Sequence, residues 1–169
     1  MIQRTVKRII PVFFILTANV HALTDDKQQL MNIAADSADL NQKTHQGTYT
    51  GHVEFTQGST SIQAAQAITK VDEHNKLTLA IINGEPGSQA RFSTKTDADK
   101  PPFHAVADQI KYYPQRHLVE LIGHARVSQG NNSLAAEKIS YDTIEHHVIT
   151  HGSKTKRIHI VLHPEEKLQ

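Results

Sequence analysis

Histidine is the residue type in this chain with the clearest capacity for chemistry, because 12 of the 169 residues are histidines. His146, His147 and His151 lie close together, and His159 and His163 are four positions apart. On an α-helix, a spacing of four would place two imidazoles on one face. The residues around His159 alternate instead as in a strand, where four residues span about 13 Å. A zinc ion needs its ligands within about 2 Å, so we expect surface histidines and no metal site.

Nucleophilic catalysis finds little support in the sequence. There is no Gly-x-Ser-x-Gly motif, and the chain has no cysteine. Asp36 and Asp108 could form a paired acid and base, but their surroundings repeat, which favours a turn or strand-end role used twice by one architecture. Lys154, Lys156 and Arg157 either meet phosphate groups or end a solvated strand. We therefore expect no catalytic residue and no cofactor.

The N-terminal residues 1–22 read as a secretory signal peptide. A basic stretch precedes the mostly apolar Ile9–Val20, and the small residue Ala22 ends the segment where a signal peptidase would cut. A spanning helix needs about 20 apolar residues, and polar residues follow too soon, from Thr24 onward. The sequence therefore predicts an exported chain whose mature N-terminus is Leu23, in preference to a membrane anchor.

Composition indicates one globular domain and excludes some partners. Hydrophobic residues make up 38% of the chain and charged residues 21%. Without residues 1–22, 15 basic and 17 acidic groups remain, a formal charge of −2. So weak a field does not favour nucleic-acid binding. An exported chain without cysteine must be held together by packing and strand pairing rather than by disulfides.

Alternating apolar residues predict an all-β fold. Tyr49–Phe55, Leu118–Val127 and Ile158–Leu162 have the period of two that indicates a strand with one buried face. The alanine-rich Asn32–Leu40 and Ala64–Val71 are the best helix candidates, but each has a counterpart in the repeat described next, so we interpret both as strands. Leu77–Ile82 is a further strand. Ser93–Lys100 is expected to be a polar loop, and residues 164–169 a flexible tail.

An internal repeat relates the two parts of the chain. A shift of 72 residues places one set of residues on another without gaps. The matches are Ala35-Asp36 with Ala107-Asp108, His45 with His117, Gly51-His52 with Gly123-His124, Gln57-Gly58 with Gln129-Gly130, and Ser61-Ile62 with Ser133-Leu134. The glycines recur where a strand must bend or turn, which glycine does without a Cβ clash. The repeat therefore predicts one several-stranded unit that occurs twice.

From about Gln29 to its C-terminus, the chain resembles the OstA-like family of periplasmic lipopolysaccharide-transport proteins. The resemblance rests on Tyr49–Gly58, Asn83–Pro86 and Leu121–Gln129, with Lys156-Arg157 before the last strand. The family repeats a Thr-Gly-x-Val element followed by Gln-Gly, and has a Gly-x-Pro before a strand that bears an aromatic residue. The order and spacing of these motifs, together with the signal peptide, are more specific than any one of them. The stretch from 87 to 100 does not align cleanly.

The resemblance implies a fold and a function. The fold would be a β-jellyroll over residues 23–163, with two antiparallel sheets in an open V, built from two related halves. The function would be that of a non-enzymatic periplasmic carrier, holding lipopolysaccharide acyl chains in an apolar groove. Implied partners are the inner-membrane and outer-membrane components of lipopolysaccharide transport and further copies of the chain, joined head to tail.

Groove residues follow from strand parity and from the family. Met31, Ile33, Ile110 and Tyr112 match family positions that line the groove, and Phe55 and Phe92 are further candidates. For each of these residues, the competing interpretation is ordinary hydrophobic core.

Two other classes of function stay open at this point. The jellyroll could be a structural scaffold that links related domains without holding lipid itself. The third hypothesis, which the sequence supports least, is a periplasmic enzyme that acts on carbohydrate. Displacement of a bound fluorescent dye by lipopolysaccharide separates the carrier from the scaffold.

The outermost strands are candidates for assembly. These are the segments near Met31–Ala35 and at Ile158–Leu162, and Ile158, Ile160 and Leu162 form the predicted assembly edge. Exposed edges are normally protected by short length, charge or proline. The last segment has no charge at neutral pH and no proline before Pro164, so we expect it to pair with a partner strand.

Overall fold

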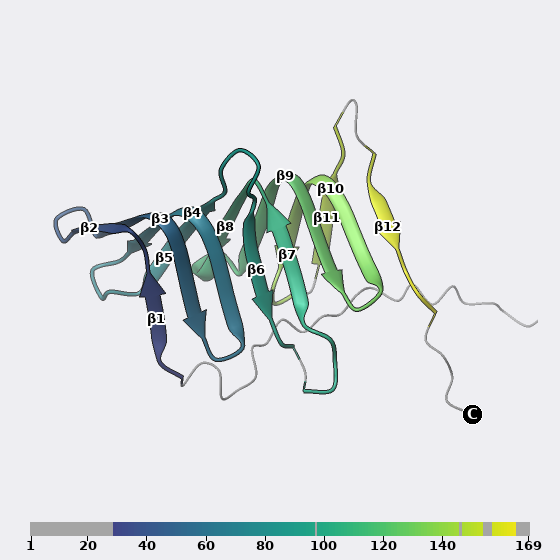
Figure 1. The fold of residues 1–169 in the computed structure, drawn as a ribbon, viewed down its shortest axis with the longest axis horizontal. Coiled ribbons are helices and arrows are strands. Elements are labelled where there is room, and N and C mark those ends of the chain that lie inside the picture. Colours follow the sequence, from purple (N-terminus) through teal and green to yellow (C-terminus); the bar gives the residue numbers. More distant parts are fainter. Residues whose placement is uncertain (1–28, 97, 146, 154–156, 165–169) are drawn as a thin grey trace, which may run out of the picture.

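A computed structural model describes residues 29–96, 98–145, 147–153 and 157–164 (Figure 1). The predicted signal peptide and most of the predicted tail lie outside these residues, as do His146, Lys154 and Lys156. The strands are β1 (Met31–Ala34), β2 (Ser37–Asn41), β3 (Gln46–Gln57), β4 (Thr60–Val71), β5 (Leu77–Asn83), β6 (Ala90–Thr94), β7 (Phe103–Ala107), β8 (Gln109–Tyr113), β9 (Leu118–Gln129), β10 (Asn132–Asp142), β11 (His147–His151) and β12 (His159–Val161), with a short 3-10 helix η2 (Pro114–Arg116). The described chain has no helix long and apolar enough to cross a membrane.

Every strand pairing is antiparallel, which confirms the all-β prediction. The expected strands at Tyr49–Phe55, Ala64–Val71 and Leu118–Val127 lie inside β3, β4 and β9. Asn32–Leu40 is not one strand but two, β1 and β2, because the chain turns at Ala35-Asp36.

Ser93–Lys100 was wrongly expected to be entirely loop, since β6 continues to Thr94. The Thr94 side chain is only 1% exposed. Its hydroxyl oxygen lies 2.9 Å from that of Thr60, and this hydrogen bond compensates for burying a polar group. A polar sequence can therefore continue a strand when its buried hydroxyl has a partner.

The 12-stranded sheet folds into two layers because four long strands change neighbours along their length. Along one of its two sides, each long strand pairs with one neighbour in its first part and with a different neighbour in its second part. These long strands are β3, β4, β9 and β10. The first layer has the order β1-β3-β4-β6-β7-β9-β10-β12, and the second layer β2-β3-β4-β5-β8-β9-β10-β11. In Figure 1, β5 and β8 lie farther from the viewer than β3, β4 and β6, with β1 and β2 at one end of the long axis and β12 at the other.

Glycines in left-handed conformation mark the bends of β3 and β9. Gly51 has a φ of 78° and Gly123 a φ of 76°, and the histidine after each also has positive φ. The register between β3 and β4 shifts at the first bend, and the register between β9 and β10 shifts near the second. The matched geometry lies at positions 72 residues apart, as the sequence repeat requires.

An aspartate secures each bend. The backbone N–H of Asp36 donates to the carbonyl oxygen of Gly51 at 2.9 Å, and that of Asp108 donates to Gly123 at the same distance. Each carboxylate accepts a hydrogen bond from the Nδ1 of the following histidine, His52 or His124, at 2.8 Å. Both aspartates are therefore tied to the bends, which is the strand-end role that their repetition predicted.

Side chains from both layers form one buried cluster. The second layer contributes large residues, with Ile82, Ile110, Leu121 and Ile139 each no more than 6% exposed. The first layer contributes mainly small ones, namely Ala90, Ala105, Ala107, Ala125, Val127 and Ala136. Large residues of one layer thus pack against small residues of the other, which lets the two faces approach closely.

Replacing a bend glycine by alanine should destabilise the fold. A Cβ on Gly51 would lie 2.2 Å from Asp36 Oδ2, and one on Gly123 would lie 2.3 Å from Asp108 Oδ2. Gly87 also has positive φ, 87°, but a Cβ there would meet nothing within 4 Å. We expect Gly51→Ala and Gly123→Ala to lose about 3 kcal/mol in urea unfolding, against about 1 kcal/mol for the control Gly87→Ala. Equal losses at the three sites would show that the aspartate contact is unimportant.

The His52 pair should make stability depend on pH. The hydrogen bond to Asp36, followed by the charge of that carboxylate, raises the pKa of His52 above its usual value. A raised histidine pKa stabilises the fold below the unfolded value of about 6.5, and the effect is lost as pH rises through the folded pKa. His52→Asn keeps a residue that tolerates the left-handed backbone. We expect the difference in unfolding free energy between wild type and this variant, measured by urea unfolding, to favour the wild type more at pH 5.5 than at pH 8.5. A difference independent of pH would contradict the assignment.

Candidate functional site

The inner face of the first layer carries a continuous row of apolar residues. Each of its eight strands contributes one residue, and each residue is the register partner of the next. This first apolar row is Ile33, Phe55, Ile62, Phe92, Ala105, Val127, Leu134 and Ile160. Register partners on adjacent strands lie on the same face of a sheet, so the row crosses the whole layer without a polar interruption.

The second layer has matching rows on its own inner face. The second apolar row is Ala38, Tyr49, Ala67, Ile82, Ile110, Leu121 and Ile139, and ends at Thr150. Beside it lies a mixed row with Leu40, Gly47, Thr69, Ala80, Tyr112, Val119, Tyr141 and Val148. Residues of both layers join the same buried cluster, so the rows face one another.

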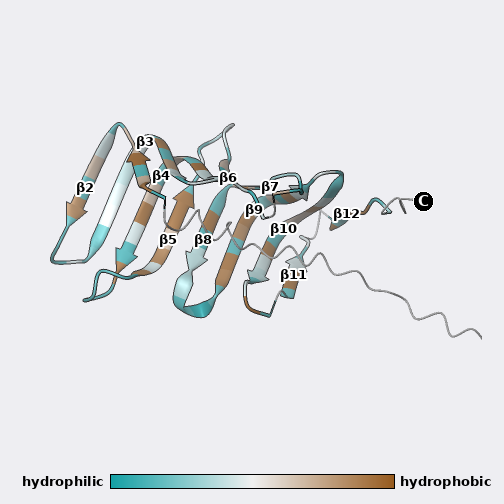
Figure 2. Ribbon diagram, turned by 90° about the horizontal axis from the view of Figure 1, so that it is seen from below, coloured by the Kyte–Doolittle hydropathy of each residue, from teal (hydrophilic) through white to brown (hydrophobic). Residues whose placement is uncertain are grey.

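Burial changes along the rows from the middle outward. In the first apolar row, Ala105 in the middle is 4% exposed, whereas Ile33 is 43% and Ile160 is 62% exposed at the two ends. Other large apolar residues are exposed near the same ends, Leu30, Met31 and Leu40 at one and Ile149, Ile158, Val161 and Leu162 at the other. Figure 2 shows hydrophobic segments along strands in both layers. Apolar surface of this kind indicates interaction sites at both ends.

All six predicted groove residues lie on the inner faces. Ile33 and Phe55 are register partners, and Met31 shares their face two positions earlier. Phe92 joins their row through Ile62, although its segment fits the family motifs poorly.

The second layer holds the other two predicted groove residues, Ile110 and Tyr112. Ile110 belongs to the buried cluster. Tyr112 is 38% exposed.

Two tyrosines of the mixed row are partly shielded from water. Tyr112 and Tyr141 are linked through Val119 on the strand between them. Burial raises the pKa of both phenols above the usual value, with the charge of Asp142 adding to the shift of Tyr141. Both side chains therefore stay neutral and add apolar rings to this face.

Five members of the first apolar row were not predicted as groove residues, although one of them, Ile160, was predicted as part of the assembly edge. These five are Ile62, Ala105, Val127, Leu134 and Ile160, and the repeat carried a usable signal for Val127. The repeat places Val127 at the position of Phe55, and Leu134 at the position of Ile62. Applying the groove assignment of Phe55 to its repeat partner would have identified Val127. Ala105 and Ile160 have no such signal, since their places depend on pairing between strands distant in sequence.

The predicted assembly edge lies at the end of the first layer. β12 comprises only His159–Val161 and, in the described part of the chain, pairs with β10 alone. Ile158 and Leu162 flank it and are 39% and 59% exposed. β1 pairs with β3 alone at the opposite end.

Metal-ligating side chains do not gather in the described ranges, where no group of three or more histidines, aspartates and glutamates is placed to hold an ion. His147 and His151 lie at the two ends of β11, and His159 lies in β12. The chemistry that the inner faces can perform is binding of apolar groups.

Comparison with known proteins gives the same picture. Residues 32–147 match the family model described as "LptA/(LptD N-terminal domain) LPS transport protein". The lipopolysaccharide export system protein LptH of Pseudomonas aeruginosa is 32% identical, over 95% of this chain and 97% of its own length. LptA of Escherichia coli K12 is 30% identical, over 86% of this chain and 77% of its own length.

A solved structure resembles the fold as well. It is the crystal structure of LptH, the LptA-homologous periplasmic component of the conserved lipopolysaccharide transport device of P. aeruginosa. The TM-score is 0.70 at 31% identity, covering 82% of this chain and 99% of that one. Sequence and fold therefore agree with the motifs around Gly51 and Gly123: the chain belongs to the LptA/(LptD N-terminal domain) family of lipopolysaccharide transport proteins.

Proposed function

We propose that this chain is a non-enzymatic periplasmic carrier that holds the acyl chains of lipopolysaccharide between its two apolar inner faces. The observation that carries the proposal is the first apolar row, which crosses eight strands and reaches exposed residues at both ends. Membership in a family of transport proteins, and not of enzymes, supports it. So does the likeness to LptH, which is itself a periplasmic component.

The physics of lipid transfer explains why such a row is needed. Leaving an acyl chain of about a dozen carbons in water costs roughly 10 kcal/mol, at about 0.8 kcal/mol per methylene. A carrier must replace that water with apolar surface along the whole chain. Rows that run the length of both layers supply such a surface, and the neutral rings of Tyr112 and Tyr141 extend it.

The proposal includes an open V made from two related halves. Four long strands shared by both layers connect the layers at the bends, so the layers can diverge from there. Equivalent geometry at Gly51 and Gly123, and at Asp36 and Asp108, supports the relation between the halves.

The proposal also includes end-to-end assembly. β1 and β12 each have one pairing partner among the described residues and lie at opposite ends of the molecule (Figure 1). The unpaired side of one strand could add to the other strand of a second copy, or to a related domain of an inner-membrane or outer-membrane component. Because two different surfaces meet, the contact is heterologous and leaves free ends. A row of copies would then join the apolar rows into one path.

A charge placed on the apolar inner faces should weaken lipid binding. We expect that Ile33→Asp and Tyr112→Asp will each raise the concentration of purified lipopolysaccharide needed to displace a bound dye by about tenfold or more. The reason is that a carboxylate at either position must be desolvated or protonated when lipid binds. Asn32→Asp is the matched control, since Asn32 neighbours Ile33 on β1 and faces the other side of the layer. Circular dichroism establishes that each variant is folded. Folded variants that bind like the wild type would remove these residues from the site, and a wild type that binds no lipopolysaccharide would favour the scaffold.

Removing the last strand should abolish assembly. We expect a chain ending before Ile158 to sediment as a monomer at concentrations where the full mature chain associates, because β12 and its unpaired edge are gone. A chain ending after His163 keeps β12 and lacks only the tail, so it should associate like the full chain. A strictly monomeric full chain, or a truncated form that still associates, would contradict the role of β12.

A further inference from the structure

The outer face of the first layer, opposite the apolar row, presents two arginines across three adjacent strands. Arg91 on β6 is the register partner of Val106 on β7, which is the register partner of Arg126 on β9. Strands are spaced by about 4.8 Å, so the two arginine Cα atoms lie about 10 Å apart. The small side chain of Val106 between them leaves room for both guanidinium groups to reach one bound group.

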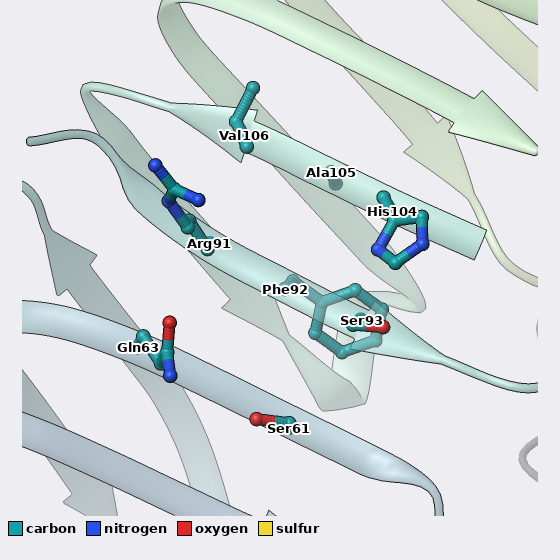
Figure 3. Close-up of a pocket in the computed structure, with 8 residues that line it drawn as sticks. All are labelled: Ser61, Gln63, Arg91, Phe92, Ser93, His104, Ala105 and Val106. Atoms are coloured by element: carbon teal, nitrogen blue, oxygen red, sulfur yellow. The ribbon is translucent and has the colours of Figure 1, made fainter. Parts of the chain in front are cut away.

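Two adjoining hollows lie on this face and share Arg91 and Val106. One, of about 430 Å³, is also lined by Gly87, Gln89, His124 and Arg126. The other, of about 440 Å³, is lined in addition by Ser61, Gln63, Ser93 and His104, with parts of Phe92 and Ala105 (Figure 3). Strand alternation places Phe92 on the other face from Arg91 and Ser93. The hollows therefore combine cations with hydroxyl and amide donors.

Carboxylates do not neutralise these arginines within the described ranges. Neither Arg91 nor Arg126 forms an ion pair with any described residue. No aspartate or glutamate is among the described residues that line the two hollows. Asp108 lies behind two of the lining residues and accepts hydrogen bonds from them, from His124 at 2.8 Å and from Gln89 at 3.0 Å. Glu54 shares the outer face but lies beyond Gln63, two strands from Arg91. The charge of the hollows is therefore positive.

The donor set fits a phosphate group better than a carboxylate. A guanidinium offers parallel N–H donors that match phosphate oxygens in a bidentate arrangement. The side-chain amide of Gln89 already donates to Asp108 and to the carbonyl oxygen of His124. The two guanidiniums, together with the side-chain donors of Ser61, Ser93 and Gln63, supply more hydrogen bonds than the two oxygens of one carboxylate can accept. His124 is oriented through its Nδ1 by Asp108, which leaves its Nε2 on the side of the ring away from that carboxylate. Solvated arginines on a sheet surface are common, but here they flank one small residue in a lined hollow.

We propose that the outer-face hollow between Arg91 and Arg126 binds a phosphate group, carried either by the headgroup of a glycolipid or by a free phosphate compound. The site lies on the opposite face of the first layer from the apolar row, so it is separate from the acyl-binding surface. Only the glycolipid source rests on the proposed carrier function.

Titration with inorganic pyrophosphate tests the site itself. In the full mature chain, ¹H–¹⁵N spectra should shift at amides of β6, β7 and β9, and calorimetry should give saturable binding that weakens with salt. Arg91→Gln and Arg126→Gln should each weaken that binding by about tenfold. Arg116→Gln is the matched control, because Arg116 belongs to η2, lies over the ring of Tyr113 and does not line either hollow. Absence of shifts at these strands, or unchanged binding by both folded variants, would overturn the proposal.

Lipopolysaccharide with and without its phosphates identifies the source. If the glycolipid is the ligand, the two variants should lose affinity for phosphorylated lipopolysaccharide and bind dephosphorylated lipopolysaccharide like the wild type. If a free compound is the ligand, the variants lose pyrophosphate binding only. Should the wild type bind no lipopolysaccharide in either form, the carrier function fails while the pyrophosphate result still decides the site.

Discussion

The bend that Asp36 holds at Gly51, and Asp108 at Gly123, is the constraint on which the rest of the structure depends. Four long strands must each lie in two layers, and a strand can change direction sharply only where its backbone leaves the extended region. Glycine adopts the positive φ that this requires, and the aspartate approaches so closely that a Cβ would collide with it. Without these bends, β3 and β9 would continue in one layer, and the inner faces would have no opposing surface.

The apolar rows depend on register as well as on the bends. On β3, the inward residues Tyr49 and Val53 are an even number of positions apart, whereas on β4 the inward residues Ala64 and Ala67 are three apart. The odd step places Thr69 on the inner face and Ile68 on the outer. The same odd step recurs on β10, between Ala136 and Ile139. In the β3-β4 and β9-β10 hairpins, one strand therefore has one residue more than its partner across the bend. This extra residue keeps the residues of both apolar rows on the inner face after the strands turn.

These irregularities mark the limit of what the sequence could predict. Alternation and the 72-residue repeat were sufficient to find β3, β4, β5 and β9, the bend glycines and the equivalence of Asp36 and Asp108, because each is a local pattern. Strict alternation along β4 would have continued from Ala64 to Gln66 and Ile68, and so assigned the wrong face. Strand β6 was missed in part because the burial of Thr94 depends on Thr60, a residue distant in sequence. Pairing between distant strands decides such positions, and no short window of sequence contains it.

The composition of the interior bears on how such a molecule could hold a lipid. The first layer meets the second mainly through alanines, and burying an alanine methyl removes little apolar area from water compared with burying a leucine or phenylalanine. Larger side chains of the first layer, Ile62, Phe92, Phe103 and Leu134, are only partly buried around the cluster. When two faces touch mainly through small residues, separating them loses less hydrophobic stabilisation than opening a core in which large side chains interlock. An acyl chain entering between the layers would restore much of that loss with its own methylenes, while the bends continue to hold the layers together.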